Sequence, residues 1–254
     1  MQIDIWCAFC ERISDPTLLR RYTQLLTDAE RAQEARFHFA EDRHRYRVTR
    51  ALLRTVLSRY HDIAPERWTF TPNAYGRPSI SNDSDGARRI SFNLSHTRKL
   101  VVLAITHDHE LGIDTEDTLT RSPPLEIADR FFAPDEVASL RALPTSRQSV
   151  RFFQYWTLKE SYIKARGLGL SLPLDQFAFH FPRPEQIRLE IQPQLRDAAE
   201  KWRLRQWWVD ERLQHMVALC AHSIGTEPPK VLLKEIVPLE SEGDLQGTLI
   251  ASSS

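Results

Sequence analysis

The 254-residue chain lacks most features that would assign it to a membrane, secreted or nucleotide-binding class. Its three cysteines are too few for a disulfide framework, and no apolar run approaches the ~20 residues that a membrane helix needs. The first residues, MQIDIWCAFC, show no basic segment ahead of an apolar one, as a signal peptide would. Neither a G-x-G-x-x-G nor a P-loop lysine motif occurs. We therefore expect a cytoplasmic protein that does not act at a membrane.

The chain also has no excess of charge of either sign. Lys+Arg and Asp+Glu both total 34, so the formal net charge is zero. Domains that bind nucleic acid are commonly basic, and we therefore expect no nucleic acid among the partners. Hydrophobic residues make up 41% and charged residues 27%, which is typical of a globular protein with ample core.

Apolar periodicity divides the chain into two similar series of elements. Residues 2–10 alternate like a strand, residues 15–60 have helical spacing with a break near residue 27, and strands follow up to residue 107. A strand, helices and further strands then recur up to residue 222. This order predicts an α+β fold with two similar α+β halves, residues 1–108 and 109–225. Residues 226–254 hold one apolar run and are predicted to be a partly ordered C-terminal tail.

The second helical segment of the first half is dense in arginine. Arg43, Arg47, Arg50 and Arg54 recur three or four residues apart, so they share a helix face. Such a face is usually solvated, with acidic partners nearby. The alternative is a face that receives phosphate through charge-assisted hydrogen bonds.

The segment Trp156–Leu170, WTLKESYIKARGLGL, places charge beside an apolar helical stripe. Lys159 and Glu160 straddle the stripe, Lys164 follows Glu160 by one turn, and Gly167 supplies a helix stop. One interpretation is an i,i+4 surface pair of Glu160 and Lys164, which contributes about 0.2–0.5 kcal/mol. The other is a site in which Glu160 binds a metal ion and the two lysines bind an anionic ligand.

Two further carboxylates follow an apolar strand, LVVLAI, in the sequence LGIDTE. Asp114 and Glu116 lie two residues apart, so on a strand they share a face. Two carboxylates on one face repel each other unless they are solvated or bound to a cation, and all-oxygen ligands suit Mg²⁺ better than Zn²⁺. With Glu160 they would form a three-carboxylate Mg²⁺ site. On its own the D-x-E pattern is weak, because many exposed strands carry it.

Ser95 and His96 lie at a predicted strand end and are followed closely by Arg98 and Lys99. This cluster could hold a phosphate, whereas a single histidine is more often packed or exposed. A nucleophilic Ser95–His96 pair is disfavoured, because neighbours on a strand point to opposite faces and no G-x-S-x-G motif occurs.

Four motifs stand in order along the chain: Gly76-Arg77-Pro78, FNLSH at 92–96, GIDTE at 112–116, and WTLKESYIKA at 156–165 followed by GLGL at 167–170. Their order and spacing, over residues 1–225, closely resemble the Sfp-type 4′-phosphopantetheinyl transferases. The resemblance implies an enzyme that moves the phosphopantetheine arm of coenzyme A to a serine of an apo acyl, peptidyl or aryl carrier protein, releasing adenosine 3′,5′-bisphosphate. It also implies a pseudo-dimer of two α+β halves with the active site in the cleft between them.

The resemblance further implies roles for the charged residues of the last two motifs. Asp114 and Glu116 match metal-binding carboxylates, and Glu160 matches a carboxylate that binds the metal, serves as the base, or does both. Lys159 and Lys164 match lysines that face the pyrophosphate. The expected catalytic residues are thus Glu160, Asp114 and Lys164, with Mg²⁺ as the metal and Mn²⁺ as an alternative.

Coenzyme A is the co-substrate that the resemblance implies, and the remaining matches concern its binding. Ser95 and His96 match the contact to its 3′-phosphate, and Arg45 matches a basic residue near that phosphate. Arg77 and Pro78 belong to a turn in which the family commonly has lysine before the proline. Arginine keeps the charge and adds a fork that holds phosphate through two hydrogen bonds.

Two other functions use the same residues. A Mg²⁺-dependent nucleotide hydrolase would need the same carboxylates and lysines, with water as the nucleophile. A non-catalytic module would bind coenzyme A or carrier proteins, although binding alone does not require three carboxylates. We expect a monomer, because two fused halves already form the cleft. Fatty acid, polyketide and nonribosomal peptide carriers all remain candidate partners.

Overall fold

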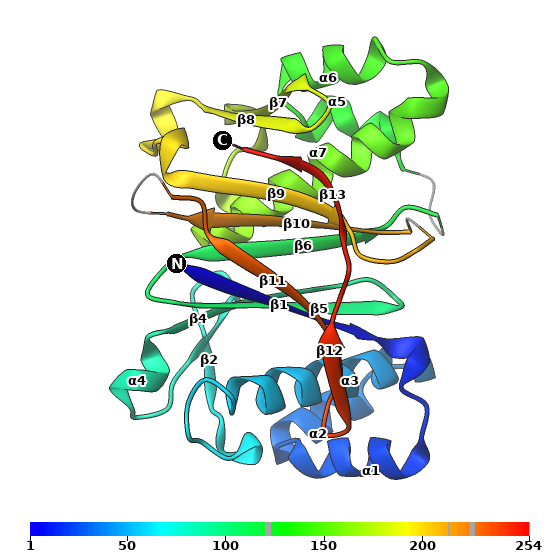
Figure 1. Cartoon of the computed structure of the whole chain (residues 1–254), viewed down its shortest axis with the longest axis vertical. Coiled ribbons are helices and arrows are strands. Elements are labelled where there is room, and N and C mark those ends of the chain that lie inside the picture. Colours follow the sequence, from blue (N-terminus) through cyan, green and yellow to red (C-terminus); the bar gives the residue numbers. More distant parts are fainter. Residues whose placement is uncertain (120–122, 213, 224–226, 254) are drawn as a thin grey trace. The chain divides into compact units, whose positions relative to one another are not determined.

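The computed structural model describes residues 1–119, 123–212, 214–223 and 227–253, which divide into two compact units (Figure 1). The N-terminal unit contains residues 3–108 and 231–245, and the C-terminal unit contains residues 1–2, 109–230 and 246–254. Among the helices of the described ranges, none combines the length and the apolar character that crossing a membrane would require.

The N-terminal unit is built on a sheet of five strands in the order β12-β11-β1-β5-β4. β1 pairs antiparallel with β5, β5 with β4, and β11 with β12. The strand β5 is buried along nearly its whole length, which explains its unbroken apolar sequence. The strands are β1 (Gln2–Phe9), β4 (Ile90–His96), β5 (Leu100–His107), β11 (Lys230–Val237) and β12 (Ser241–Asp244), with a separate hairpin of β2 (Phe70–Pro72) and β3 (Pro78–Ile80).

Helices of this unit begin where the sequence supplies capping groups. The Asp15 carboxylate accepts hydrogen bonds from the N–H groups of Thr17 and Leu18, and Thr27 forms a capping box with Glu30. The predicted helix break near residue 27 is therefore confirmed. The helices are α1 (Pro16–Leu25), α2 (Asp28–Ala35), α3 (Ala40–Leu57) and α4 (Asp85–Arg88), with 3-10 turns η1 (Cys10–Arg12) and η2 (Pro65–Arg67).

The C-terminal unit contains a six-stranded sheet in the order β6-β10-β9-β13-β8-β7. All its pairings are antiparallel except that of β13 with β8. The strands are β6 (Leu111–Asp117), β7 (Phe177–Arg183), β8 (Gln186–Ile191), β9 (Trp202–Trp208), β10 (His215–His222) and β13 (Thr248–Ser252).

The long helix α7 (Thr145–Arg166) packs against β6 and β10 and carries the KES motif. It ends at Gly167, whose φ of 64° is the left-handed conformation that favours glycine. Phe152 stacks on Trp156, with ring centroids 6.0 Å apart, on the apolar side of the helix. The other helices are α5 (Ala128–Phe131) and α6 (Pro134–Arg141), with 3-10 turns η3 (Leu125–Ile127), η4 (Gly169–Ser171), η5 (Leu174–Gln176), η6 (Pro193–Leu195) and η7 (Ala199–Lys201).

Both units thus place a long helix, α3 or α7, against a largely antiparallel sheet, and the predicted α+β class with two similar halves is confirmed. The C-terminal segment, which the sequence predicts to be a partly ordered tail, contains β11, β12 and β13. β11 and β12 extend the N-terminal sheet, whereas β13 lies between β9 and β8 and buries Ala251 completely. The predicted boundary at residues 225 and 226 lies outside the described residues.

Candidate active site

A close contact between β6 and α7 creates the candidate site. Gly112 lies on the face of β6 that meets α7, and a Cβ atom there would approach the Ser161 carbonyl oxygen to 2.0 Å and the Ala165 nitrogen to 2.3 Å. Only glycine therefore allows the helix to lie so close to the strand. Since alternate residues of a strand share a face, Asp114 and Glu116 follow Gly112 on the side of α7.

Asp114 and Lys164 join the two elements. Nζ of Lys164 lies 2.6 Å from Oδ1 of Asp114, whose side chain is only 6% exposed. The charges of both residues affect the pKa of Glu160, which lies one turn before Lys164. Burial raises the pKa of Glu160, the negative charge of Asp114 raises it further, and Lys164 partly opposes these effects. A carboxylate with a raised pKa is suited to accepting a proton near neutral pH.

The structure brings the predicted carboxylates to one strand–helix contact without assembling a metal cluster. Within the described ranges, no three histidine, cysteine or acidic side chains gather closely enough to hold a metal ion. The Lys164 ammonium group supplies the positive charge beside Asp114. The donors nevertheless suit a hard cation, because they are carboxylate oxygens and because Asp114 and Glu160 repel each other.

Lys159, which is predicted to face a pyrophosphate, lies inside the C-terminal unit. Its side chain is 2% exposed, and Nζ lies 2.8 Å from Oε2 of Glu136. The same ammonium group donates hydrogen bonds to the carbonyl oxygens of Leu174, at 2.7 Å, and Phe177, at 2.8 Å. Because an ammonium group has three protons, these acceptors satisfy it inside the C-terminal unit.

Glu136 is the residue that sequence analysis missed. It follows Pro134 near the start of α6, and its carboxylate accepts hydrogen bonds from the N–H groups of Ala133 and Phe179, both at 2.8 Å. A glutamate in the first turn of a helix is common, so its position indicates a helix start. Nothing in the sequence indicates its partner on α7.

A hollow of about 540 Å³ in the N-terminal unit contains Arg45. Arg45 lies 2.8 Å from Asp42, and Arg98 pairs with Glu41, so each cation in the hollow already has a carboxylate partner. An incoming phosphate would exchange with these carboxylates rather than meet bare cations. The lining residues are Phe39, Ala40, Glu41, Asp42, Arg45 and Arg98.

The two strand-end motifs of this unit lie side by side. The Arg77 guanidinium donates to the carbonyl oxygen of Phe92, at 3.4 Å, which joins the turn before Pro78 to the FNLSH strand β4. Ser95 is buried and His96 is exposed, as their alternation on β4 predicts.

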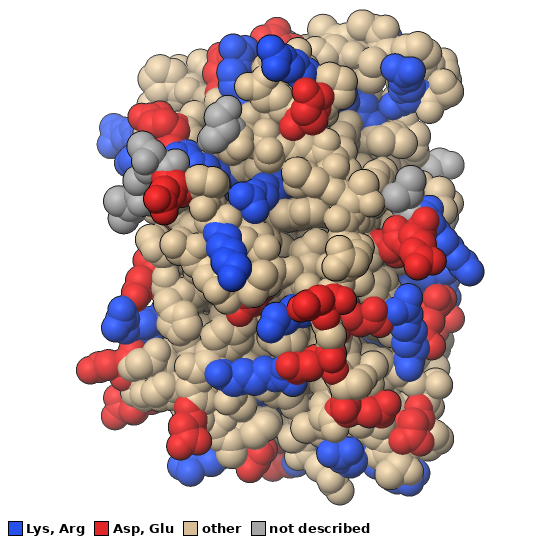
Figure 2. Space-filling view, viewed as in Figure 1, with Lys and Arg blue, Asp and Glu red and all other residues tan. Residues whose placement is uncertain are grey.

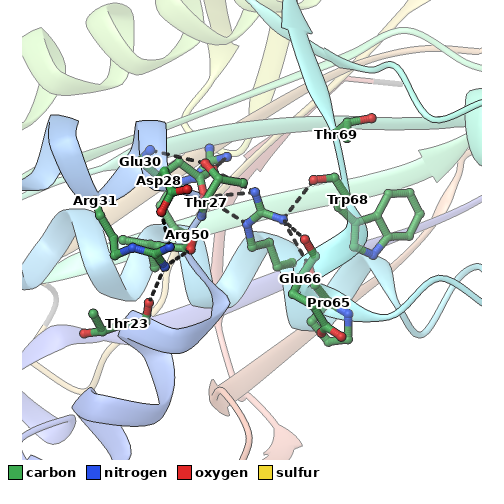
Figure 3. A network of polar contacts seen from close by, with 12 residues as sticks. Thr23, Thr27, Asp28, Glu30, Arg31, Arg50, Pro65, Glu66, Trp68 and Thr69 are labelled. Carbon is green, nitrogen blue, oxygen red and sulfur yellow. Dashed lines mark hydrogen bonds and ion pairs between the residues drawn. The ribbon is translucent and has the colours of Figure 1, made fainter.

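The arginine face of α3 is neutralised by α2. Arg47 pairs with Glu34, and Glu30 pairs with both Arg50 and Arg54. The acidic partners that the sequence predicts are thus present for Arg47, Arg50 and Arg54. The face is solvated at Arg43, which is exposed, but not at Arg54, which is 1% exposed. Figure 3 shows this network around Glu30 and Arg50.

Backbone groups complete the shell of Arg54. Its guanidinium donates to the carbonyl oxygens of Trp68, at 2.8 Å, and Pro65, at 3.0 Å. These two bonds come from Nη1, and Nε and Nη2 donate to the Glu30 carboxylate. All three nitrogens of the guanidinium group therefore have partners within the protein. Arg54 therefore belongs to the fold and not to a phosphate-binding surface.

Ion pairs also occur across the molecular surface. Arg88 pairs with Asp83, and Arg141 pairs with Asp129, all four with side chains at least half exposed. Figure 2 shows basic and acidic side chains interleaved over the face in view. This mixture agrees with the net charge of zero.

Two family models match the chain. Residues 110–220 match the 4′-phosphopantetheinyl transferase superfamily, and residues 15–108 match the model described as 4′-phosphopantetheinyl transferase, N-terminal. Together they contain the β6–α7 contact and the Arg45 hollow.

Curated relatives give the same result. The 4′-phosphopantetheinyl transferase HetI of Nostoc sp. is 34% identical over 168 residues, which cover 66% of this chain and 70% of the relative. Sfp of Bacillus subtilis is 35% identical over 171 residues, covering 67% and 73%. A further 4′-phosphopantetheinyl transferase of Bacillus subtilis is 33% identical over 194 residues, covering 76% and 81%.

Proposed function

The chain belongs to the Sfp-type 4′-phosphopantetheinyl transferases, and from this premise we propose that it transfers the phosphopantetheine arm of coenzyme A to a serine of apo carrier proteins. The second product is adenosine 3′,5′-bisphosphate. The observation that carries the proposal is the convergence of Asp114, Glu160 and Lys164 where Gly112 lets α7 approach β6.

The proposed step is a displacement at the phosphorus atom that bears the pantetheine arm. The serine oxygen forms the new P–O bond as the P–O bond to adenosine 3′,5′-bisphosphate breaks. Glu160 accepts the serine proton as the general base. Lys164 offers a fixed positive charge, which stabilises the negative charge that develops on the leaving phosphate oxygen.

We propose Mg²⁺ as the metal, held by Asp114 and Glu160 and completed by Glu116. When bound, it would neutralise pyrophosphate charge during the transfer, and Mn²⁺ would serve as a substitute. The donor chemistry supports this, since oxygen ligands and two mutually repelling carboxylates favour a hard divalent cation.

For coenzyme A, we propose that Arg45 contacts the 3′-phosphate together with Ser95 and His96, and that Arg77 and Pro78 form a second contact. The support is the Arg45 hollow and the hydrogen bond from Arg77 to the FNLSH strand. We further propose that the protein acts as a monomer on acyl, peptidyl or aryl carrier proteins.

Intact mass spectrometry of an apo acyl carrier protein, incubated with this protein, coenzyme A and Mg²⁺, tests the proposal. We expect a gain of one phosphopantetheine, abolished by EDTA and by Asp114→Ala, and strongly slowed by Glu160→Gln. Glu190→Gln, at an exposed position of β8, is the matched control and should transfer normally.

The alternatives predict different products in the same experiment. A hydrolase would form adenosine 3′,5′-bisphosphate without any carrier protein. A binding module would retain coenzyme A with no gain of mass on acyl or peptidyl carriers. Either result would overturn the proposed transfer.

A further inference from the structure

Lys159 and Glu136 form a deeply buried ion pair, with side chains 2% and 0% exposed. Burial raises the pKa of the Glu136 carboxyl group and lowers that of the Lys159 ammonium group, so each charge is costly to bury and depends on the other. Replacing a buried ion pair with apolar residues of similar volume often leaves a protein equally stable or more stable. Net stability alone therefore does not explain the Lys159–Glu136 pair.

The pair ties three segments to the middle of α7. Glu136 belongs to α6 and also receives the N–H of Phe179, in β7. Lys159 reaches the carbonyl oxygens of Leu174, in η5, and Phe177, at the start of β7. Its ammonium group also lies 4.3 Å from the Phe177 ring centroid.

This anchoring bears directly on the neighbouring residue. Successive residues of an α-helix are rotated by about 100°, so fixing the direction of Lys159 also fixes that of Glu160. Lys159 points into the core of the unit, whereas Lys164, one turn after Glu160, contacts Asp114. A helix that rolled or slid at Lys159 would carry Glu160 and Lys164 away from Asp114.

We propose that Glu136 and Lys159 are positioning residues, which set the rotation of α7 and thereby aim Glu160 and Lys164 at Asp114, and that Lys159 does not contact the pyrophosphate. The inference rests on the proposed transfer function. It assigns a role to Glu136, and it replaces the phosphate-binding role expected for Lys159 from its motif.

The geometry disfavours a Lys159 that turns outward to meet phosphate. All three of its protons have protein acceptors, and its departure would leave the Glu136 carboxylate buried without a cation. Lys164, in contrast, is 26% exposed and lies on the side of Asp114. Lys159 therefore stabilises the core of the unit, and Lys164 is the lysine of the motif that binds the ligand.

A rescue experiment separates the two roles of Lys159. Lys159→Met and Glu136→Gln each leave one buried charge without its partner, whereas the double variant removes both charges. In the double variant the amide oxygen introduced at position 136 can still accept from the N–H of Phe179. For each variant we would measure the transfer rate, KM for coenzyme A, the affinity for adenosine 3′,5′-bisphosphate, and thermal unfolding.

We expect Glu136→Gln to lower kcat by about tenfold or more at a nearly unchanged KM for coenzyme A, because displacing a catalytic group by about 1 Å costs on the order of a hundredfold. The double variant should recover most of the rate and the melting temperature. Asp129→Asn, which breaks the exposed pair with Arg141, is the control. It should change neither the transfer rate nor the melting temperature.

The contrary results are distinct. A double variant that transfers as slowly as Lys159→Met, or that does not fold, would overturn the inference, as would a folded Glu136→Gln with the wild-type rate. A Lys159→Met variant that folds but binds adenosine 3′,5′-bisphosphate or coenzyme A more weakly would assign Lys159 to the ligand. A wild-type chain that transfers nothing would overturn the proposed function, and the inference with it.

Discussion

Nζ of Lys164 lies 2.6 Å from Oδ1 of Asp114, and this contact joins the two segments that carry the acidic motifs. The segments are 50 residues apart in sequence. They meet because Gly112 has no side chain to hold α7 away from β6. The position of Glu160 beside β6 therefore depends on Gly112, although Gly112 has no reactive side chain.

Gly112→Ala is expected to destabilise the protein and abolish transfer. The new Cβ atom would lie 2.0 Å from the Ser161 carbonyl oxygen and 2.3 Å from the Ala165 nitrogen, both of them backbone atoms that cannot rotate away. Overpacking of this kind costs about 1–3 kcal/mol and sometimes more. Urea unfolding and the carrier-protein mass assay would measure the two effects.

Gly243→Ala is the matched control for that substitution. A Cβ atom on Gly243 would have no heavy atom within 4 Å, and its φ is not in the left-handed range. We expect wild-type stability and transfer. Equal behaviour of the two variants would show that the close approach of α7 to β6 is not required.

The sequence predicts elements better than it predicts partners. β6 and α7 follow from apolar periodicity, and the helix break predicted near residue 27 coincides with the Thr27 capping box. The partner of Lys159 could not be predicted, because helical periodicity indicates which face is buried and not which acid lies opposite. The motif alone therefore groups Lys159 with Lys164, although the two point to different surroundings.

The C-terminal strand escapes prediction for a related reason. The segment TLIAS is five residues long, with no alternation strong enough to predict a strand. It forms β13 by pairing with β9 on one side and β8 on the other, and both strands are distant in sequence. Tertiary context of this kind decides β structure more than local propensity does.

Lys164→Met is expected to weaken binding of coenzyme A. Hydrogen bonds to charged groups contribute about 1.5–3 kcal/mol, so the dissociation constant should rise by roughly 10–100-fold. Isothermal titration of coenzyme A with the folded variant would measure this. Lys201→Met, at an exposed site of the same unit, should bind normally. Unchanged affinity of the Lys164 variant would remove Lys164 from the ligand site.

Glu30→Gln is expected to destabilise the protein in a pH-dependent manner. Burial raises the pKa of Glu30, but Arg50, Arg54 and the Thr27 N–H outweigh it, and the folded-state pKa is lowered. A lowered carboxyl pKa stabilises the fold above the unfolded value of about 4.3, and this contribution is lost as the pH falls through the folded value. The variant should therefore lose about 3–5 kcal/mol at pH ~7 and less at pH ~3, which is below the unfolded value.

Asp28→Asn on the same helix is the control for Glu30→Gln. Asp28 pairs with Arg31, but its side chain is 99% exposed, so this pair should contribute at most about 1 kcal/mol. Free energies of unfolding from urea titrations at the two pH values would be compared. If Glu30→Gln lowered the free energy of unfolding by the same amount at both pH values, the proposed role of the Glu30 charge would be contradicted.

Ala251→Asp is expected to disrupt the C-terminal sheet. Ala251 is fully buried in β13, between β9 and β8, and an aspartate there would place a charge in the core without a cation. A cost of about 3 kcal/mol or more corresponds to a fall in Tm of roughly 6–12 °C or more. Leu249→Asp changes the same strand at a side chain that is 54% exposed, and it should melt near the wild-type temperature. Thermal unfolding by circular dichroism would compare them, and similar melting of both variants would mean that β13 adds little to the sheet.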